Sequence, residues 1–266
     1  MRKLLFLCLL LASSINVQAA AFNHSDWDAL LKKHVITVGQ GEVTQVDYAG
    51  MAADRSDLKN YLSSLSATGM QQFESWPEQA QLAFLINAYN AWTIELILTA
   101  YPDIESIKEL GSLFQSPWKK EFIPLLGEVR SLDDIEHGFI RAEGRYQNPY
   151  IHFAVNCASI GCPALLPEAY SAKTLDRQLK EATANFLRDR SRNRLEGQTL
   201  KISSIFKWYR QDFERGWEGF HSLEAFFSEH SESLDLSAAD VKRLLAGDIE
   251  VEYLDYDWRL NGKRSR

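Results

Sequence analysis

One segment of this chain is too apolar to lie anywhere but in the middle of a fold. From Pro77 to about Ala100 the sequence PEQAQLAFLINAYNAWTIELILTA places hydrophobic residues on almost every side of a helix. Ser75 and Pro77 suit the start of such a helix, and Pro102 suits its end. A helix that is apolar all round is buried by its neighbours. We therefore expect a central helix around which the rest of the chain packs.

The other periodic segments predict more helices than strands. Helical spacing covers residues 26–33, 54–65, SLDDIEHGFIR, 172–190, SSIFKWYRQDF and two short stretches between 223 and 246. Extended chain is expected in KKEFIPLLGEVRSL, which turns at Gly127, in PYIHFAV, in QTLKI and near 249–254. The strands cluster late and do not alternate regularly with helices. The predicted fold class is α+β: a single helix-rich domain with a small late-forming β-sheet around the central buried helix.

The N-terminus has the pattern of a cleavable secretory signal peptide, residues 1–19. Arg2 and Lys3 precede an apolar run, and Val17-Gln18-Ala19 offers a small-residue cleavage site. We expect a mature globular domain of residues 20–266 that is secreted or periplasmic. No later segment reaches about 18 uncharged apolar residues, so no integral membrane segment is expected in the mature chain.

The charge balance argues against nucleic acid as a partner. The chain has 29 lysine and arginine residues against 36 acidic residues, and loss of Arg2 and Lys3 takes the net charge from −7 to −9. Such a surface repels phosphate backbones. No C-x-x-C or H-E-x-x-H pattern indicates a metal site, and we expect neither a metal nor a cofactor.

The stretch HFAVNCASIGCP contains Cys157 and Cys162, the cysteines that would remain after processing. In an oxidising compartment they are expected to form a disulfide. The alternative is a thiol nucleophile at Cys157, which needs an imidazole base and a group that orients it. His137 and His152 are the candidate bases, and the candidate orienting groups are Glu136, Asn87 and Asn90.

Two rival chemistries use the same stretch. CASIG resembles a G-x-S-x-G turn with cysteine in place of the first glycine, which would make Ser159 a nucleophile with His221 or His230 downstream. A metal site built from the two histidines and two cysteines, His137, His152, Cys157 and Cys162, has suitable ligand atoms but lacks the usual spacing.

Several polar residues stand out against apolar surroundings. Asn87 and Asn90 share one side of the central helix, where they either bond a neighbouring loop backbone or line a pocket. Asp133, His137 and Arg141 form a row at four-residue spacing, in a helix capped by Ser131 and Asp134. On the expected PYIHFAV strand, His152, Ala154 and Asn156 would face one way.

Several sequence blocks together resemble the domain of unknown function 547 family. The blocks are FLINAYNAWTIELIL, SLDDIEHGFIR, IHFAVNCASIGCPAL, AYSAKTLDRQLKEA, IFKWYRQDF and YDWRLN, which span about residues 79–261. The resemblance implies little chemistry. It singles out Asn87 and Asn90, Asp134 to His137, His152 to Ala154, and Tyr256 to Trp258. Some relatives carry other residues at the cysteine positions, which favours a site centred on His, Glu and Asn.

Two functional hypotheses follow. The first is a cysteine-type hydrolase or acyl/amide transferase acting on a cell-envelope or peptide-like substrate. The second is a non-enzymatic envelope binding or scaffold protein with a Cys157–Cys162 disulfide and a polar pocket for a small-molecule, peptide or envelope ligand. The candidate catalytic residues are Cys157, His137, His152 and Glu136. The candidate binding residues are Asn87, Asn90, Asn156 and Trp258.

Overall fold

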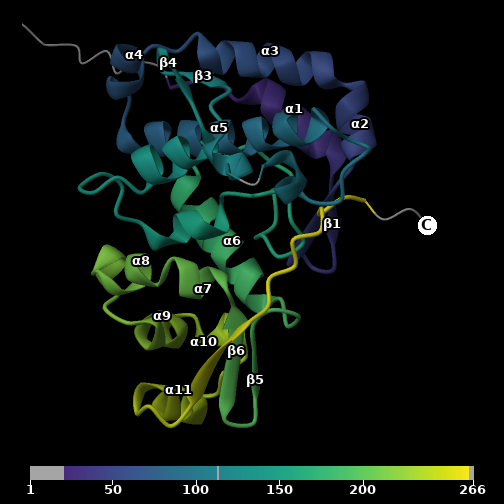
Figure 1. Cartoon of the computed structure of the whole chain (residues 1–266). Helices are drawn as coiled ribbons and strands as arrows, with labels where there is room; N and C mark the ends of the chain where they lie inside the picture. The colour runs from purple at the N-terminus through teal and green to yellow at the C-terminus, as the bar shows by residue number, and fades with distance from the viewer. Residues whose placement is uncertain (1–20, 113, 264–266) are drawn as a thin grey trace, which may run out of the picture.

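A computed structural model describes residues 21–112 and 114–263 (Figure 1). The expected signal peptide, residues 1–19, lies outside the described residues. The helices of the N-terminal half are α1 (Ser25–His34), α2 (Tyr48–Ala53), α3 (Arg55–Ser66), α4 (Met70–Glu74) and α5 (Glu78–Leu98). Those of the C-terminal half are α6 (Leu175–Arg188), α7 (Ile205–Trp208), α8 (Arg210–Glu214), α9 (Leu223–Glu229), α10 (Ser231–Leu234) and α11 (Ala238–Leu245).

In the described residues, five short helical turns of other types connect these elements. Four are 3-10 helices: η1 (Ile107–Leu110), η2 (Pro117–Lys119), η4 (Pro149–Phe153) and η5 (Trp217–Gly219). The fifth, η3 (Asp134–Ile140), is a π-helix. Helices α1 to α5 occupy one half of the molecule, and α7 to α11 occupy the other, with α6 between them (Figure 1).

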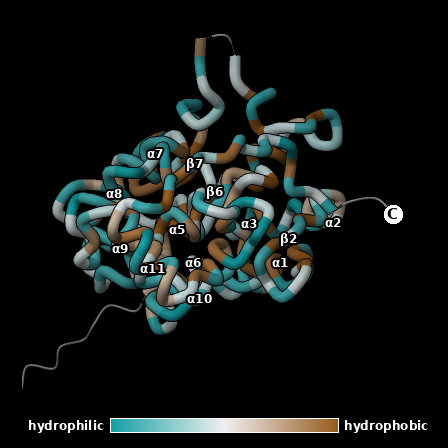
Figure 2. Tube along the Cα trace, turned by 90° about the horizontal axis from the view of Figure 1, so that it is seen from below, coloured by the Kyte–Doolittle hydropathy of each residue, from teal (hydrophilic) through white to brown (hydrophobic). Residues whose placement is uncertain are grey.

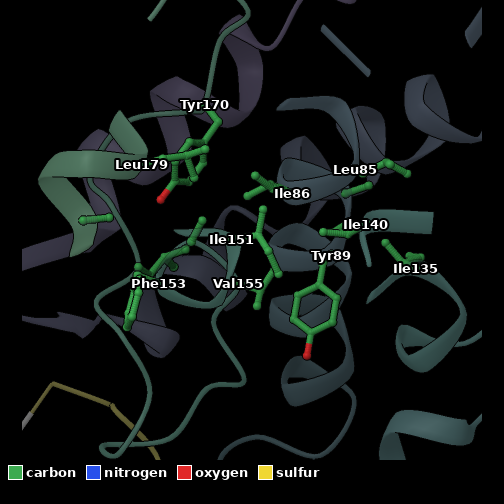
Figure 3. Packing of buried hydrophobic residues seen from close by; sticks show 14 of the residues in the cluster. Leu85, Ile86, Tyr89, Ile135, Ile140, Ile151, Phe153, Val155, Tyr170 and Leu179 are labelled. Carbon is green, nitrogen blue, oxygen red and sulfur yellow. The ribbon is translucent and has the colours of Figure 1, made fainter. Parts of the chain in front are cut away.

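The central helix is α5, as its sequence predicts. Every residue from Leu82 to Leu98 is buried. Figure 2 shows hydrophobic chain gathered around α5 in the interior and mostly hydrophilic chain at the outside. Leu85, Ile86 and Tyr89 project from α5 among residues of η3 and η4 (Figure 3). One cluster of buried hydrophobic residues runs from Trp27 to Ile249, so both halves share a core.

Within the part of the chain that the structure describes, the strands form three small sheets, which confirms the α+β class. The late sheet has the order β5 (Arg194–Glu196), β6 (Thr199–Ser203), β7 (Glu250–Leu254). Strands β6 and β7 are parallel, with Leu200 opposite Val251, and helices α7 to α11 form the crossover between them. The hairpin β3 (Ile123–Leu125) and β4 (Glu128–Arg130) turns at Gly127, as expected. The hairpin β1 (Val35–Val38) and β2 (Val43–Val46) was not predicted.

The strand expected for PYIHFAV is wrong, because this segment forms the 3-10 helix η4. Pro149 stands in its first turn, and the Asn148 side chain accepts a hydrogen bond from the backbone N–H of Tyr150 at 2.9 Å. This cap starts a helical turn instead of extended chain. The two-face alternation expected for His152, Ala154 and Asn156 therefore does not apply.

The helix expected in SLDDIEHGFIR is the π-helix η3. Its predicted cap is confirmed: the Ser131 hydroxyl donates to Asp134 Oδ2 at 2.7 Å and accepts from the Asp134 N–H at 3.1 Å. Single π-helical turns often occur at functional sites. This turn carries Glu136 and His137.

The chain after β7, residues 255–263, runs back across the molecule toward β1 and β2 (Figure 1). Its backbone forms hydrogen bonds with the cysteine loop, residues 157–162: the N–H of Ile160 donates to Arg259 O, and the N–H of Gly161 donates to Asp257 O. It also bonds β2, where the N–H of Val46 donates to Asn261 O. This return segment places residues from the C-terminus beside the cysteines.

In residues 21–112 and 114–263, no helix combines the length and apolar character needed to cross a membrane.

Candidate functional site

A cavity of about 180 Å³ lies where α5, η3, the cysteine loop, α7 and the return segment meet. Each segment contributes side chains to its wall. Six of these are aromatic, and four others are titratable. The aromatic residues are Tyr89, Trp118, Trp208, Tyr209, Tyr256 and Trp258, and the titratable ones are Asp133, Glu136, His137 and His152.

The aromatic wall is a contiguous cluster of rings. The Trp258 ring lies 4.5 Å from Tyr256 and 5.7 Å from both Trp118 and Trp208, measured between ring centroids. Trp208 is half-exposed, although large aromatic rings are usually well buried. Lys108 Nζ lies 4.2 Å from the Trp258 ring centroid, which shows that this wall already attracts one cation.

Glu136 is a buried carboxylate in this cavity. It is 4% exposed, and its Oε1 has no hydrogen-bond partner. Burial, followed by the charge of the nearby Glu136 carboxylate, raises the pKa of both the Tyr89 and the Tyr209 hydroxyl, and a side-chain hydrogen bond with Glu136 adds to both shifts. Both phenols therefore remain protonated near neutral pH. A buried carboxylate oxygen without a partner costs free energy unless a ligand satisfies it.

Asp212 and His152 form a buried pair beside the cavity. His152 Nε2 lies 2.8 Å from Asp212 Oδ2, and Arg141 Nε lies 2.5 Å from the same oxygen. Burial opposes ionisation of Asp212, but hydrogen bonds from His152 and Arg141 outweigh it and lower the pKa of that carboxyl. Burial also lowers the pKa of His152, although Asp212 opposes this shift.

The protonation of His152 follows from this pairing. Because Asp212 is an ionised acceptor, the imidazole proton is assigned to Nε2, and Nδ1 carries a free lone pair. Nδ1 is buried and has no hydrogen-bond partner. The His152 ring stacks on Tyr209 at 4.0 Å between centroids, which fixes its orientation.

His137 lies at the cavity wall in a more exposed position. Arg141 Nη1 donates to His137 Nδ1 at 2.6 Å, and His137 Nε2 lies 3.8 Å from Asp133 Oδ1. The row of Asp133, His137 and Arg141 expected from the spacing is therefore present. It connects through Arg141 to the buried Asp212.

Cys157 and Cys162 form a disulfide in the cavity wall. This is the first of the two states expected for them, and it contradicts a resting thiol at Cys157. The Tyr256 hydroxyl lies 3.2 Å from Cys157 Sγ and 3.1 Å from Cys162 Sγ. The candidate bases have other partners, since His137 bonds Arg141 and His152 bonds Asp212.

The three asparagines that were candidate binding residues are buried and do not line this cavity. Asn87 accepts from Tyr170 N and donates to Tyr170 O, and Asn90 accepts from Asn156 N and donates to Ala154 O. Asn156 donates to Pro163 O and accepts from Ala158 N. Their amides thus bond loop backbone, the first of the two interpretations offered for the helix pair.

The rival chemistries find no support in the arrangement of their residues. Ser159 is buried, and the proposed partners His221 and His230 lie elsewhere, beside Gly216 and Phe226 respectively. Within the described ranges, no group of three or more His, Cys, Asp or Glu side chains is placed to hold a metal ion.

Comparison with known proteins gives one match. Residues 73–187 match the model of a family described as "Protein of unknown function, DUF547". This match assigns residues 73–187 to the DUF547 family. No curated protein and no solved structure matches the chain. Within the DUF547 segment lie Tyr89, Glu136, His137, His152 and the disulfide. Trp118 also lies within this segment, whereas the other aromatic residues of the wall lie beyond it: Trp208, Tyr209, Tyr256 and Trp258.

The cavity contains residues that the sequence did not single out. They are Tyr89, Trp118, Trp208, Tyr209 and, through its pairing with His152, Asp212. The sequence did contain a signal for some of them. The blocks IFKWYRQDF and YDWRLN are among those that resemble the DUF547 family, and both contain residues of the cavity wall. Trp118 lies outside every such block, and only the fold brings it to the site.

Proposed function

We propose that this protein is an exported, non-enzymatic ligand-binding protein whose cavity takes a small organic cation, such as a substituted ammonium group. One observation carries the proposal: the buried Glu136 carboxylate has an unpartnered oxygen among aromatic rings. Lys108 lies on the Trp258 ring. Against the effect of burial, Asp212 and then the charge of Glu136 raise the pKa of Arg141. Among the residues that the structure describes, however, no lysine or arginine forms an ion pair with Glu136.

The physical argument combines two attractions. A buried carboxylate is stabilised by a partner of opposite charge, and the faces of Trp and Tyr attract cations by about 0.5–2 kcal/mol each. Arg141 is the nearest guanidinium in the network, but Asp212 and His137 already occupy it. A cation that enters between Trp258 and Glu136 would gain both interactions. A neutral ligand of the same shape would gain only the packing.

A cysteine-type hydrolase fits this geometry less well. Such an enzyme needs a Cys157 thiolate beside an imidazole. In the oxidised protein that sulfur is bonded to Cys162.

Export is the second part of the proposal. The basic residues, apolar run and small-residue site at the N-terminus support it, and a disulfide is typical of an oxidising compartment. Expression of the full chain in a bacterial host, followed by mass spectrometry of the periplasmic fraction, is expected to yield a protein that begins at Ala20. An unprocessed protein retained in the cytoplasm would contradict this part.

Calorimetric titration with tetramethylammonium chloride tests the cavity. We expect saturable binding that Glu136→Gln weakens at least tenfold, because the variant keeps the side-chain shape and removes its charge. Glu143→Gln, at an exposed position, is the matched control and is expected to bind like the parent protein. Equal binding of tert-butanol, or binding unaffected by Glu136→Gln, would rule out a cation site. The cation site would also be ruled out if neither tetramethylammonium nor primary amines bound at millimolar concentration.

A hydrolase that activates water is the second candidate, favoured by the free Nδ1 of His152. An imidazole oriented by a carboxylate is a common general base. This hypothesis predicts slow hydrolysis of p-nitrophenyl acetate that is lost in His152→Asn and unchanged by alkylation of the reduced cysteines. No turnover above that of His152→Asn would exclude it for this substrate.

A further inference from the structure

The two sulfurs of the disulfide have different surroundings. Cys162 is 5% exposed, and its Sγ accepts a hydrogen bond from the backbone N–H of Cys157 at 2.8 Å. The Tyr256 hydroxyl lies close to both sulfurs, 3.1 Å from Cys162 Sγ and 3.2 Å from Cys157 Sγ. Cys157 is partly exposed. An incoming group therefore meets Cys157 more easily, whereas Cys162 is buried and also accepts the backbone N–H of Cys157.

Donors at a sulfur atom favour its thiolate form. Hydrogen bonds and nearby cations lower the pKa of a cysteine and make it a better leaving group. Arg192 Nη1 adds a positive charge close by, since it donates to the carbonyl oxygen of Gly161 at 3.0 Å and also to that of Cys162. Burial raises the pKa of the Tyr256 hydroxyl, so this group remains a donor at neutral pH.

Neighbouring residues hold the Tyr256 ring in place. A Cβ added at Gly161 would lie 2.9 Å from three atoms of this ring. Trp208 and Trp258 pack on the ring at 4.8 Å and 4.5 Å between centroids. The hydroxyl is therefore held at the disulfide by packing on several sides.

From this asymmetry we propose that the Cys157–Cys162 disulfide is a thiol–disulfide exchange site, at which a dithiol reductant attacks Cys157 Sγ and Cys162 leaves as the thiolate. The attacking thiolate forms a mixed disulfide with Cys157, and the electron pair of the broken S–S bond passes to Cys162 Sγ. The second thiol of the reductant then releases Cys157. In total the dithiol is oxidised to a disulfide, two electrons pass to the protein, and the two thiol protons end on the cysteines or in solvent.

The proposal is independent of the cation site, because it rests on contacts of the sulfurs and not on Glu136. Its substrate class is a protein or small molecule with two neighbouring thiols. The disulfide also forms part of the cavity wall, so a reductant reaches it from the side on which Cys157 is exposed.

Trapping with glutathione tests the direction of attack. The oxidised mature protein is incubated with reduced glutathione under native conditions, quenched with iodoacetamide and digested for peptide mass spectrometry. We expect glutathione on Cys157 and the carbamidomethyl group on Cys162, by at least tenfold over the reverse pattern. Equal labelling, the reverse pattern, or a disulfide that millimolar dithiothreitol opens only in urea would overturn the proposal.

Titration of the leaving group tests its cause. In Cys157→Ala, the thiolate absorbance of Cys162 near 240 nm is expected to appear with a pKa below the ordinary value of about 8.5. Adding Tyr256→Phe is expected to raise this pKa by about one unit, because it removes one donor and keeps the ring. Tyr253→Phe, on β7, is the matched control and is expected to leave the Cys162 titration in place. A Cys162 pKa at or above 8.5 in Cys157→Ala would contradict the assignment.

Discussion

Asp212 shows how a single side chain connects separate parts of the site. It is fully buried, and it accepts from His152 of η4, from Arg141 after η3 and from Arg215 after α8. The two arginines compensate its charge, and His152 adds a hydrogen bond. The same contacts fix the imidazole of His152 and the guanidinium of Arg141.

Loss of the Asp212 carboxylate leaves these cations without a counter-charge. We expect Asp212→Ala to lower the free energy of unfolding by about 3–5 kcal/mol, as is usual when one partner of a buried ion pair is removed. Urea denaturation followed by tryptophan fluorescence measures the change. Asp248→Asn, at an exposed position, is the control and is expected to stay within about 0.5 kcal/mol of the parent. A loss below 1 kcal/mol in Asp212→Ala would show that water replaces the carboxylate.

Sequence reasoning at this scale succeeds where contacts are local. The Ser131–Asp134 cap and the row of Asp133, His137 and Arg141 depend only on spacing of three or four residues. The pairing of His152 with Asp212 joins residues 60 positions apart and depends on how α8 packs, which no periodicity encodes.

At the scale of elements, composition predicted the helix α5 but not the helix η4. Helix α5 is apolar on all sides, so it is stable only when other elements surround it. The PYIHFAV segment is rich in strand formers, yet Pro149 and the Asn148 cap turn it into a 3-10 helix, and Asn90 of α5 bonds the backbone that follows. The β1–β2 hairpin had a readable signal, since VITV and VTQV flank a turn with Gly39 and Gly41.

Two glycines in the elements around the cavity should respond oppositely to alanine. A Cβ at Gly138 of η3 meets nothing within 4 Å, so Gly138→Ala is expected to raise the free energy of unfolding by about 0.4–1 kcal/mol. A Cβ at Gly161 would contact the Tyr256 ring at 2.9 Å, so Gly161→Ala is expected to lower it by about 1–3 kcal/mol. Thermal and urea unfolding of both variants check the signs. The same sign for both would show that the return segment adjusts freely.

For the molecule as a whole, the buried His152 and the half-buried His24 and His230 determine the response to mild acid. Burial lowers the pKa of His24 to about 4, and it also lowers the pKa of His152 and of His230. In the unfolded chain these imidazoles bind protons below about pH 6.5, whereas the folded protein keeps them neutral. Protons therefore favour the unfolded state as the pH falls from 6.5 toward 4.

Melting curves at pH 7 and pH 5 test this dependence. We expect the melting temperature to fall by at least about 2–4 °C, which corresponds to a loss of about 1 kcal/mol in a chain of this size. His24→Gln should reduce the difference between the two pH values, and the exposed His221→Gln should leave it as in the parent. A melting temperature that is constant or higher at pH 5 would contradict the burial of these imidazoles.

The return segment ties completion of the site to completion of the chain. Tyr256 and Trp258 lie within the last dozen residues of the sequence, whereas Glu136 and the disulfide precede them by about a hundred positions. Domains begin to fold from the N-terminus during synthesis. An unfinished polypeptide therefore contains Glu136 and the two cysteines before it contains the rings of Tyr256 and Trp258. The cavity is thus complete only after Tyr256 and Trp258 are translated, and a stop codon after Leu254 would leave it without these two rings.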